Sequence, residues 1–217
     1  MTRKKLQRFA EVVTFPNYIC PRENPEADVV TFLGNGPYTL EIGCGSGVYT
    51  LAFARRFPDK IVMGIDVKAA RIFFGARDAL RDNMNNAKFM RAQAELLGEY
   101  LPANSVADIW LTFPDPFLQN RRSHKRLTSE RFMKMYKELL IPGGSVHLKT
   151  DSLPLFLFTL EEWERVGVKV LEKYEDIYAM VDRGEEVPEI LTGIQTKYEK
   201  EHLAGGRKIY YVRGGWD

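Results

Sequence analysis

The glycine-rich turn near the start of the chain is the feature that most constrains its fold. Residues 40–47 read Leu-Glu-Ile-Gly-Cys-Gly-Ser-Gly, and residues 48–56 follow with helical character. Glycine adopts positive φ and lets a ligand approach the main chain closely. The backbone N–H groups of such a turn, with the positive end of the helix dipole, then face a small molecule. The pattern therefore predicts a strand, a tight turn and a helix N-terminus around a bound ligand.

Two acids beside this turn narrow the class of ligand. A dinucleotide fingerprint, G-x-G-x-x-G, needs a glycine where this chain has Val48. Glu41 ends the strand, where it would repel a pyrophosphate and attract an ammonium group. Asp66 ends the next apolar stretch, residues 61–65, at the spacing where an acid accepts hydrogen bonds from ribose hydroxyls. The alternative is that both acids are only polar strand ends.

The turn and the two acids resemble the nucleotide-binding turn of class I S-adenosylmethionine-dependent methyltransferases. The ligand of those enzymes carries a sulfonium and an amino group and no phosphate. The resemblance implies that S-adenosylmethionine is the cofactor and that the following residues bind it: Glu41, Gly43, Gly45, Gly47 and Asp66.

Strand-like and helix-like stretches alternate along the rest of the chain. This alternation predicts a parallel sheet with helices on both faces and a ligand site at the C-terminal ends of the strands. We expect one Rossmann-like α/β domain over residues 21–217, with a mostly parallel seven-stranded sheet and an antiparallel edge strand, after a flexible basic arm at residues 1–20. The expected strands are 39–42, 61–65, 87–90, 106–111, 145–149, 168–171 and 208–213, and the expected helices are 25–34, 48–57, 68–83, 95–101, 129–140 and 155–166.

Charge and cysteine usage bear on the partners and the compartment. The net charge is only +2, but Arg3, Lys4, Lys5 and Arg8 lie together with no acid among them, and a second basic cluster follows residue 120. Local basic patches favour a polyanionic partner. The two cysteines have no partner at metal-ligand spacing, so neither a metal site nor a disulfide framework is expected, which suits the cytoplasm. No apolar stretch reaches the ~20 residues needed to cross a membrane.

A carboxylate held between two prolines follows the fourth expected strand. Residues 113–117 read Phe-Pro-Asp-Pro-Phe. Proline fixes its own φ and restrains the preceding residue, so Asp115 is held extended at low entropic cost. A class I methyltransferase brings methyl donor and acceptor together at this position, which makes Asp115 a candidate for both catalysis and cofactor binding. The alternative is a proline-rich turn capped by an aspartate.

Three further motifs lie at the same predicted rim. Residues 119–126 form a basic tract that would neutralise a phosphate backbone, and the alternative is a merely solvated loop. Asp151 follows the fifth expected strand. In residues 196–199, Tyr198 offers a face on which a base can stack while Glu199 accepts from the base edge. The candidate substrate-binding residues are Gln119, Arg121, Arg122, Lys125, Arg126, Asp151, Thr196, Lys197, Tyr198 and Glu199.

The ordered set of motifs resembles the bacterial tRNA (guanine-N7)-methyltransferase family over roughly residues 20–213. The set consists of E-I-G-x-G-x-G, F-P-D-P, the basic tract, K-T-D and T-K-Y-E. The resemblance implies methyl transfer from S-adenosylmethionine to N7 of the variable-loop guanine of tRNA, at tRNA position 46. Gln93 and Gln119 stand where the family has Asp and Lys, and Phe117 stands where it has Trp. Gln93 can still accept from the adenine amino group of the cofactor.

The implied chemistry fits these residues without a general base. Guanine N7 has a lone pair and no proton, so methyl transfer from a sulfonium is an in-line displacement. Asp115 would stabilise the positive charge that develops on the base, and alignment of the two reactants supplies the rest. The rival readings are another nucleobase N-methyltransferase, such as one for adenine, and a catalytically silent fold that binds RNA. Val48 and Glu41 disfavour a nicotinamide dehydrogenase, and both a monomer and a homodimer stay open.

Overall fold

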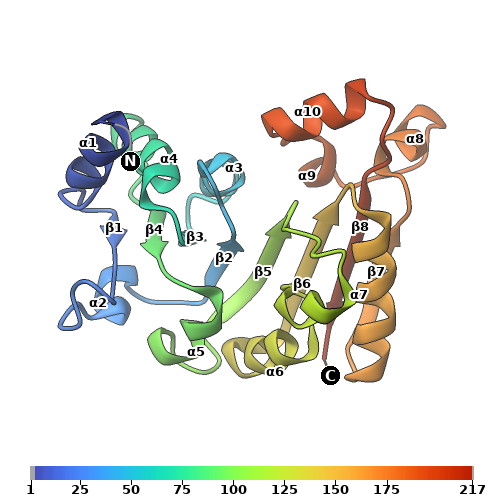
Figure 1. The fold of residues 1–217 in the computed structure, drawn as a ribbon, viewed down its shortest axis with the longest axis horizontal. Helices are drawn as coiled ribbons and strands as arrows, with labels where there is room; N and C mark the ends of the chain where they lie inside the picture. The colour runs from blue at the N-terminus through green and yellow to red at the C-terminus, as the bar shows by residue number, and fades with distance from the viewer. Residues whose placement is uncertain (1–2, 217) are drawn as a thin grey trace.

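A twisted sheet of eight strands forms the centre of the computed structural model, which describes residues 3–216 (Figure 1). The strands are β1 (Tyr18–Ile19), β2 (Tyr38–Ile42), β3 (Val62–Asp66), β4 (Ala87–Arg91), β5 (Val106–Thr112), β6 (Leu140–Thr150), β7 (Lys169–Tyr174) and β8 (Tyr210–Gly215). Across the sheet the order is β1-β4-β3-β2-β5-β6-β8-β7. The first six strands in this order run parallel, and β8 runs antiparallel to both of its neighbours.

The mostly parallel α/β sheet is confirmed, with one strand more than expected in the described part of the chain. The additional strand is β1, whose Tyr18 and Ile19 pair with β4. The predicted antiparallel pair, 168–171 with 208–213, is confirmed as β7 and β8. Strand β7 forms this edge of the sheet, so the antiparallel strand β8 lies one position inside the edge.

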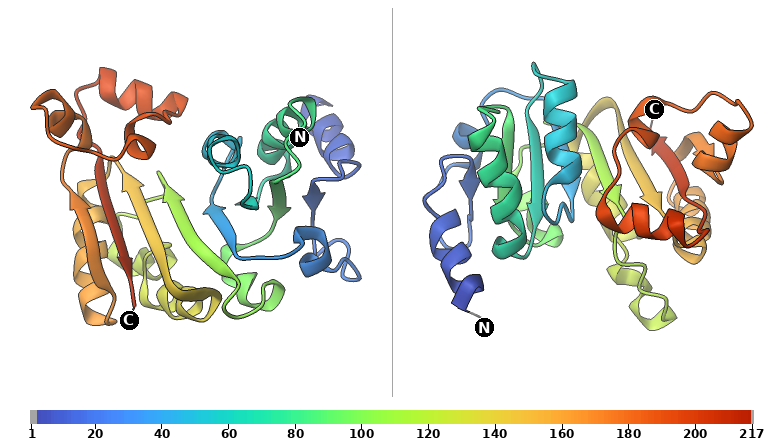
Figure 2. Two further views of the ribbon diagram at one scale, coloured as in Figure 1. Left: turned by 180° about the vertical axis from the view of Figure 1, so that it is seen from behind. Right: turned by 90° about the horizontal axis from the view of Figure 1, so that it is seen from above.

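Helices cover both faces of the sheet, as predicted (Figure 2). One buried apolar cluster joins the sheet to α2, α5, α6 and α7, and a second joins it to α1, α3, α4, α8 and α9. The helices are α1 (Arg3–Val12), α2 (Val29–Leu33), α3 (Val48–Arg56), α4 (Ala69–Arg81), α5 (Leu97–Tyr100), α6 (Glu130–Leu139), α7 (Leu153–Arg165), α8 (Ile177–Asp182), α9 (Glu189–Thr192) and α10 (Lys197–Ala204), with two short 3-10 helices, η1 (Ala94–Leu96) and η2 (Asn120–Lys125). No helix in the described residues is long and apolar enough to cross a bilayer.

The segment expected as a separate basic arm is folded against the domain wherever the structure describes it. Helix α1 packs along α4, and Val12 at its end is fully buried. Phe9 lies on the same face as Val12, three residues earlier, and its ring lies 5.1 Å from the guanidinium of Arg91 in β4. Because β1 pairs with β4, the expected boundary at residue 20 falls inside the fold. Because positively charged residues dominate this segment, its sequence did not reveal that the apolar residues form one face of a helix.

Helices α8, α9 and α10 form a cap beside the C-terminal end of β6 (Figure 1). They fill the connection between β7 and β8, where the sequence predicted no helix. Lys149 near the end of β6 contacts Leu191 in α9 and Glu199 in α10, so the cap is tied to the strand ends. The cap therefore stands next to the predicted site.

Candidate active site

The three glycines of the predicted turn all take positive φ: 83° at Gly43, 56° at Gly45 and 78° at Gly47. A Cβ at Gly47 would lie 2.8 Å from the ring of Phe89 and 3.2 Å from the Cα of Gly75, so only glycine allows α3 to start this close to β4 and α4. A Cβ at Gly43 or Gly45 would meet no atom within 4 Å. The main chain of the turn therefore faces open space, as a ligand-binding turn requires.

A cavity of about 300 Å³ lies beside this turn, at the C-terminal ends of β2, β3 and β5. Four of the predicted cofactor- and substrate-binding residues line it: Gly43, Asp66, Asp115 and Lys125. Its apolar wall includes Ile42, Ile65, Ala92, Phe113, Leu127 and Phe132. Motifs that are far apart in the sequence thus meet at one edge of the sheet.

Asp66 both organises the turn and lines the cavity. One carboxylate oxygen accepts from the backbone N–H of Gly45 at 3.1 Å, and the other accepts from that of Lys68 at 2.8 Å. Each carboxylate oxygen has lone pairs for a further donor. Asp66 can therefore hold the turn and still accept a hydrogen bond from a hydroxyl in the cavity.

Glu41, expected as a direct cofactor ligand, does not line this cavity. Its Oε2 accepts from the backbone N–H of Thr50 at 2.8 Å and from the Thr50 hydroxyl at 2.5 Å, and its Oε1 accepts from the Thr112 hydroxyl at 2.7 Å. Neighbouring residues on a strand face opposite sides, so Glu41 lies under α3 while Ile42 lines the cavity. Burial outweighs the hydrogen bonds and raises the pKa of Glu41 to about 7. Through these hydrogen bonds, Glu41 joins β2 to α3 and β5.

Asp115 lies exposed at the rim of the cavity, in an unusually shaped loop. Phe113 and Phe117 flank the Pro-Asp-Pro segment and have φ values of 50° and 40°. This left-handed region is unfavourable for residues other than glycine. The sequence predicted a restrained carboxylate here from its prolines, and the two phenylalanines add a restraint that no sequence signal announced.

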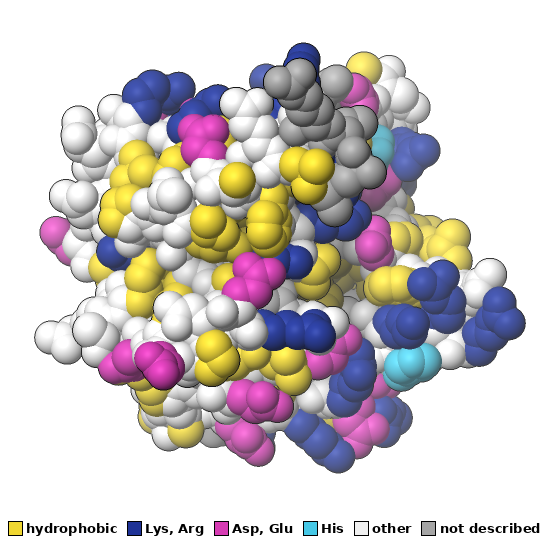
Figure 3. Space-filling view, turned by 60° about the vertical axis from the view of Figure 1, so that its left-hand side comes forward, with side chains coloured by type: hydrophobic (Ala, Val, Ile, Leu, Met, Phe, Trp, Pro, Cys, Tyr) yellow, Lys and Arg dark blue, Asp and Glu magenta, His cyan; other side chains and the backbone are white. Residues whose placement is uncertain are grey.

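The basic tract after this loop divides into an exposed part and a buried residue. Gln119, Arg121, Arg122 and Lys125 are exposed around η2. The guanidinium of Arg122 lies 4.9 Å from the ring centroid of Phe117, and Arg121 donates to the Gln119 side chain at 3.2 Å. Figure 3 shows Lys and Arg side chains gathered at the right-hand side of one face of the molecule. The contact of these exposed residues with a polyanion stays a prediction.

Arg126, expected as a phosphate ligand, is instead buried, with 6% of its surface exposed. It donates to the carbonyl oxygens of Pro116 and Phe117, both at 3.0 Å, and its guanidinium lies 4.2 Å from the ring centroid of Phe158 in α7. The tract looks uniformly basic in sequence, and only the packing of α7 distinguishes this arginine from its neighbours.

Gln93, expected beside the adenine of the cofactor, is exposed and lies next to the cavity. It lines a neighbouring hollow that shares Val67 and Ala92 with the cavity. The side chain is therefore close to the predicted ligand position without being part of the cavity wall.

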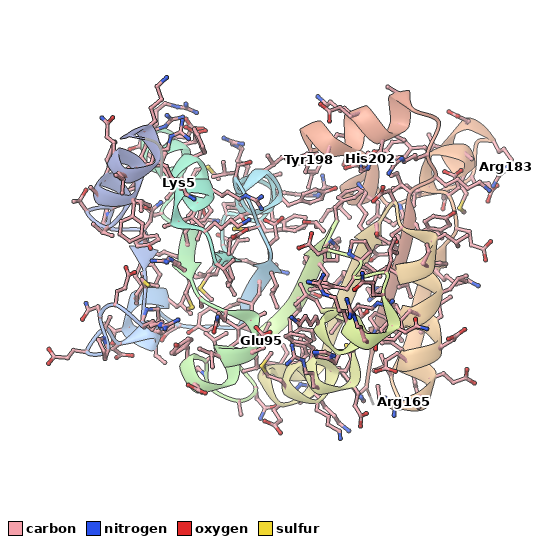
Figure 4. All side chains as sticks on the ribbon, in the orientation of Figure 1. Lys5, Glu95, Arg165, Arg183, Tyr198 and His202 are labelled. Atoms are coloured by element: carbon pink, nitrogen blue, oxygen red, sulfur yellow. The ribbon has the colours of Figure 1, made fainter. Side chains whose placement is uncertain are left out.

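Asp151 contacts α10 and the segment that follows it, and residues 196–199 form the start of α10. The Asp151 carboxylate lies 3.1 Å from His202 Nδ1 and 2.8 Å from Arg207 Nη1. Thr196 caps α10 by accepting from the backbone N–H of Glu199 at 3.1 Å, and Tyr198 is 67% exposed. Figure 4 shows Tyr198 and His202 on α10. Lys197 is the first residue of α10, and its side chain lies outside the described part of the chain.

Glu199, expected to accept from the edge of a base, is fully buried in this structure. Its Oε1 lies 2.5 Å from Lys149 Nζ and 2.8 Å from the Tyr178 hydroxyl, and its Oε2 lies 3.0 Å from the Tyr49 hydroxyl. Burial lowers the pKa of the Lys149 ammonium, and the Glu199 carboxylate opposes that shift. The sequence does not reveal Lys149 and Tyr49 as buried partners of Glu199, because a lysine at a strand end and a tyrosine in a helix look like surface residues.

Comparison with solved structures defines the class of fold. The 30S ribosomal A1408 methyltransferase from an uncultured bacterium superposes with a TM-score of 0.60 at 15% identity, over 87% of this chain and 92% of that one. The geranyl diphosphate C-methyltransferase of Streptomyces coelicolor, solved with S-adenosyl-L-homocysteine, gives 0.55 at 16% identity, over 90% of this chain and 79% of that one. The fold is therefore that of the class I methyltransferases.

Sequence relatives narrow this class to one family. The family model described as "Putative methyltransferase" matches residues 35–212. The tRNA (guanine-N(7)-)-methyltransferase of Christiangramia forsetii is 39% identical over 98% of this chain and 97% of its own length. That of Porphyromonas gingivalis is 42% identical over 85% and 73%. The chain belongs to the tRNA (guanine-N(7)-)-methyltransferase family.

Proposed function

We propose that this chain transfers a methyl group from S-adenosylmethionine to N7 of the variable-loop guanine of tRNA, at tRNA position 46. The observation that carries the proposal is a single cavity lined by Gly43, Asp66 and Asp115. It connects the glycine turn, where a cofactor can approach the main chain, with the carboxylate next to which a base would react. Family membership supplies the substrate class.

The cavity suits S-adenosylmethionine on the side of the glycine turn. Open space in front of Gly43 and Gly45 leaves room for the cofactor. Asp66 has free lone pairs for the ribose hydroxyls, and Gln93, in the neighbouring hollow, would accept from the adenine amino group. The bound cofactor supplies a methyl group on a sulfonium. Glu41 contributes indirectly, because its contacts to Thr50 and Thr112 hold β2, α3 and β5 together.

Asp115 has the role of stabilising charge rather than moving a proton. Guanine N7 has a lone pair and no proton, so the reaction needs no general base. The base becomes positively charged as its new bond forms, and a carboxylate at the rim of the cavity stabilises that charge. The remaining contribution is alignment of the two reactants in the cavity.

The tRNA is held by the exposed part of the basic tract and by the cap. Arg121, Arg122 and Lys125 neutralise phosphates, and Gln119 lies beside them. A guanine in a folded tRNA must leave its stack to reach the cavity, and the exposed ring of Tyr198 offers a surface for the displaced base. Asp151, which contacts α10, and Thr196, which caps it, are proposed as further substrate contacts. The proposal includes action in the cytoplasm, as a monomer or homodimer.

Identification of the methylated nucleoside tests the proposal. The protein is incubated with labelled S-adenosylmethionine and unmodified bulk tRNA, and the digested nucleosides are separated. We expect N7-methylguanosine as the product. A methylated adenosine would instead support the rival nucleobase methyltransferase. Cofactor binding by calorimetry without any methylated product would support the silent RNA-binding reading.

Asp115→Asn removes the charge of the candidate catalytic carboxylate and keeps its shape. We expect a loss of turnover on the order of 10²-fold, with tRNA binding and thermal stability unchanged, because the charge acts on the transition state. Asp59→Asn, in an exposed turn, is the matched control. Full turnover of the Asp115 variant would show that Asp115 has only a structural role in the turn.

A further inference from the structure

Arg126 is the one basic side chain of tract 119–126 that is buried in the described structure. Only 6% of the surface of Arg126 is exposed, whereas Arg121, Arg122 and Lys125 are exposed. A phosphate on a molecule as large as tRNA can contact the exposed side chains directly. It can contact Arg126 only if this residue first gives up its partners inside the protein.

Those partners are two consecutive carbonyl oxygens and an aromatic ring. Nε donates to Pro116 O at 3.0 Å, and Nη2 donates to Phe117 O at 3.0 Å. The guanidinium lies 4.2 Å from the ring centroid of Phe158, which α7 supplies. The planar fork of arginine suits two adjacent acceptors, and the ring of Phe158 fixes the plane of the fork. Arg126 therefore joins the loop after β5 to α7.

The two carbonyls that Arg126 binds belong to the residues that directly follow Asp115. Phe117 is held at a φ of 40°, and Phe113 on the other side of Asp115 is held at 50°. Such conformations persist in residues other than glycine only where the surroundings impose them. The two hydrogen bonds from Arg126 supply that restraint on the C-terminal side of Asp115.

We propose that Arg126 is a positioning residue that keeps the Asp115 carboxylate at the rim of the cavity, and that it is not a ligand of tRNA phosphate. It acts through the backbone of Pro116 and Phe117, without touching either reactant. The inference rests on the proposed function for its effect on turnover. Its effect on the loop is independent of any substrate.

Arg126→Lys separates positioning from phosphate binding because it keeps the positive charge and loses the fork. We expect kcat to fall about tenfold or more, since a small displacement of a catalytic group has effects of that size. We expect KM for tRNA, and the slope of log affinity against log salt, to stay as in the wild type. Arg122→Gln, which removes a proposed phosphate contact, should instead weaken tRNA binding and flatten the slope of log affinity against log salt by roughly 0.7–0.9. Arg81→Lys, an exposed arginine at the end of α4, is the matched control.

Weaker tRNA binding with a flatter salt slope and normal kcat in the Arg126 variant would overturn the proposal, as would a variant with no change at all. Phe158→Leu removes the stacking ring without altering any charge, and it should lower kcat in the same selective way. If the arginine variant fails to fold, the Phe158 variant still tests the proposal.

Hydrogen exchange of peptides covering residues 113–118 tests the inference without any substrate. Exchange should be faster in Arg126→Lys than in the wild type, and unchanged in Arg81→Lys. Faster exchange together with a wild type that makes no N7-methylguanosine would overturn the proposed function and leave the positioning role intact. Unchanged exchange would overturn the positioning role, whatever the reaction is.

Discussion

At the scale of single residues, Glu41 and Lys149 carry ionisable groups into the interior and are satisfied in different ways. Glu41 has the hydroxyls of Thr50 and Thr112 and a backbone N–H, with no cation among these hydrogen-bond donors. Lys149 has the carboxylate of Glu199. Protonation can relieve the cost of burying Glu41, whereas Lys149 depends on its partner. The two residues therefore lead to different predictions.

Glu41 makes the stability of the fold depend on pH. Its pKa rises from an ordinary 4.5 to about 7 in the folded state, so between these values the native state binds more protons than the unfolded state. The free energy of unfolding should therefore fall as the pH rises through this window, by at most roughly 3 kcal/mol.

Glu41→Gln should remove this part of the pH dependence, because the amide can accept from Thr50 and donate to Thr112 without ionising. The measurement is urea unfolding at about pH 5 and about pH 8, with the exposed Glu138→Gln as control. Equal pH dependence in the wild type and the Glu41 variant would show that the carboxyl titrates normally.

Lys149→Met leaves Glu199 buried without its counter-ion. We expect a loss of about 3–5 kcal/mol in the free energy of unfolding. Adding Glu199→Met should recover most of that loss, because the double variant removes both charges of this buried pair. A denaturant double-mutant cycle measures both values. A loss below about 1 kcal/mol for the single variant would mean that water reaches the pair, as in a surface salt bridge.

The candidate site shows where charge in a sequence is a good guide and where it fails. Asp66 and Asp115 were predicted because each follows an apolar strand, and a strand end of a parallel sheet has a known place. Glu41 was predicted to face a ligand because it ends a strand beside the glycine turn, Arg126 because it belongs to the basic tract, and Glu199 because it belongs to the T-K-Y-E motif. Their partners come from Thr112, Phe158 and Lys149, which only the tertiary fold brings close.

At the scale of elements, Gly47 links the glycine turn to the packing of α3. Gly47→Ala meets both a positive φ of 78° and a contact of 2.8 Å with Phe89. Gly143→Ala meets a φ of 79° with no atom within 4 Å. The second change should cost about 1–2 kcal/mol for its backbone alone, and Gly47→Ala should cost clearly more. Thermal unfolding of the two variants side by side provides the comparison, and equal losses would argue against the close packing at Phe89.

Elements with strong local signals were predicted closely, and short elements were not. The helix expected at 48–57 is α3 (Val48–Arg56), and that expected at 129–140 is α6 (Glu130–Leu139). Glycines, prolines and helical periodicity mark such elements in the sequence itself. Strand β1 has two residues and α9 has four. Elements this short have no periodicity, and contacts with distant parts of the chain determine them.

At the scale of the whole molecule, strand β8 has neighbours on both sides although the chain forms it after both of them. Strands β6 and β7 are complete by residue 174, and residues 210–215 then pair with both. During synthesis, the facing edges of β6 and β7 therefore lack their native strand partner until β8 leaves the ribosome.

Because of this delay, the pairing of β6, β8 and β7 is completed only at the end of synthesis. A nascent chain stalled with residues 210–215 still inside the ribosome should be cleaved by added protease within residues 140–174, because unpaired strand edges are open to other chains and to enzymes. A chain stalled with the same residues outside should resist. Equal protection of both chains would contradict this prediction, because it would mean that β6 and β7 become resistant to protease before β8 pairs with them. The glycine turn is thus translated early, but the half of the sheet beside it becomes rigid only when β8 arrives.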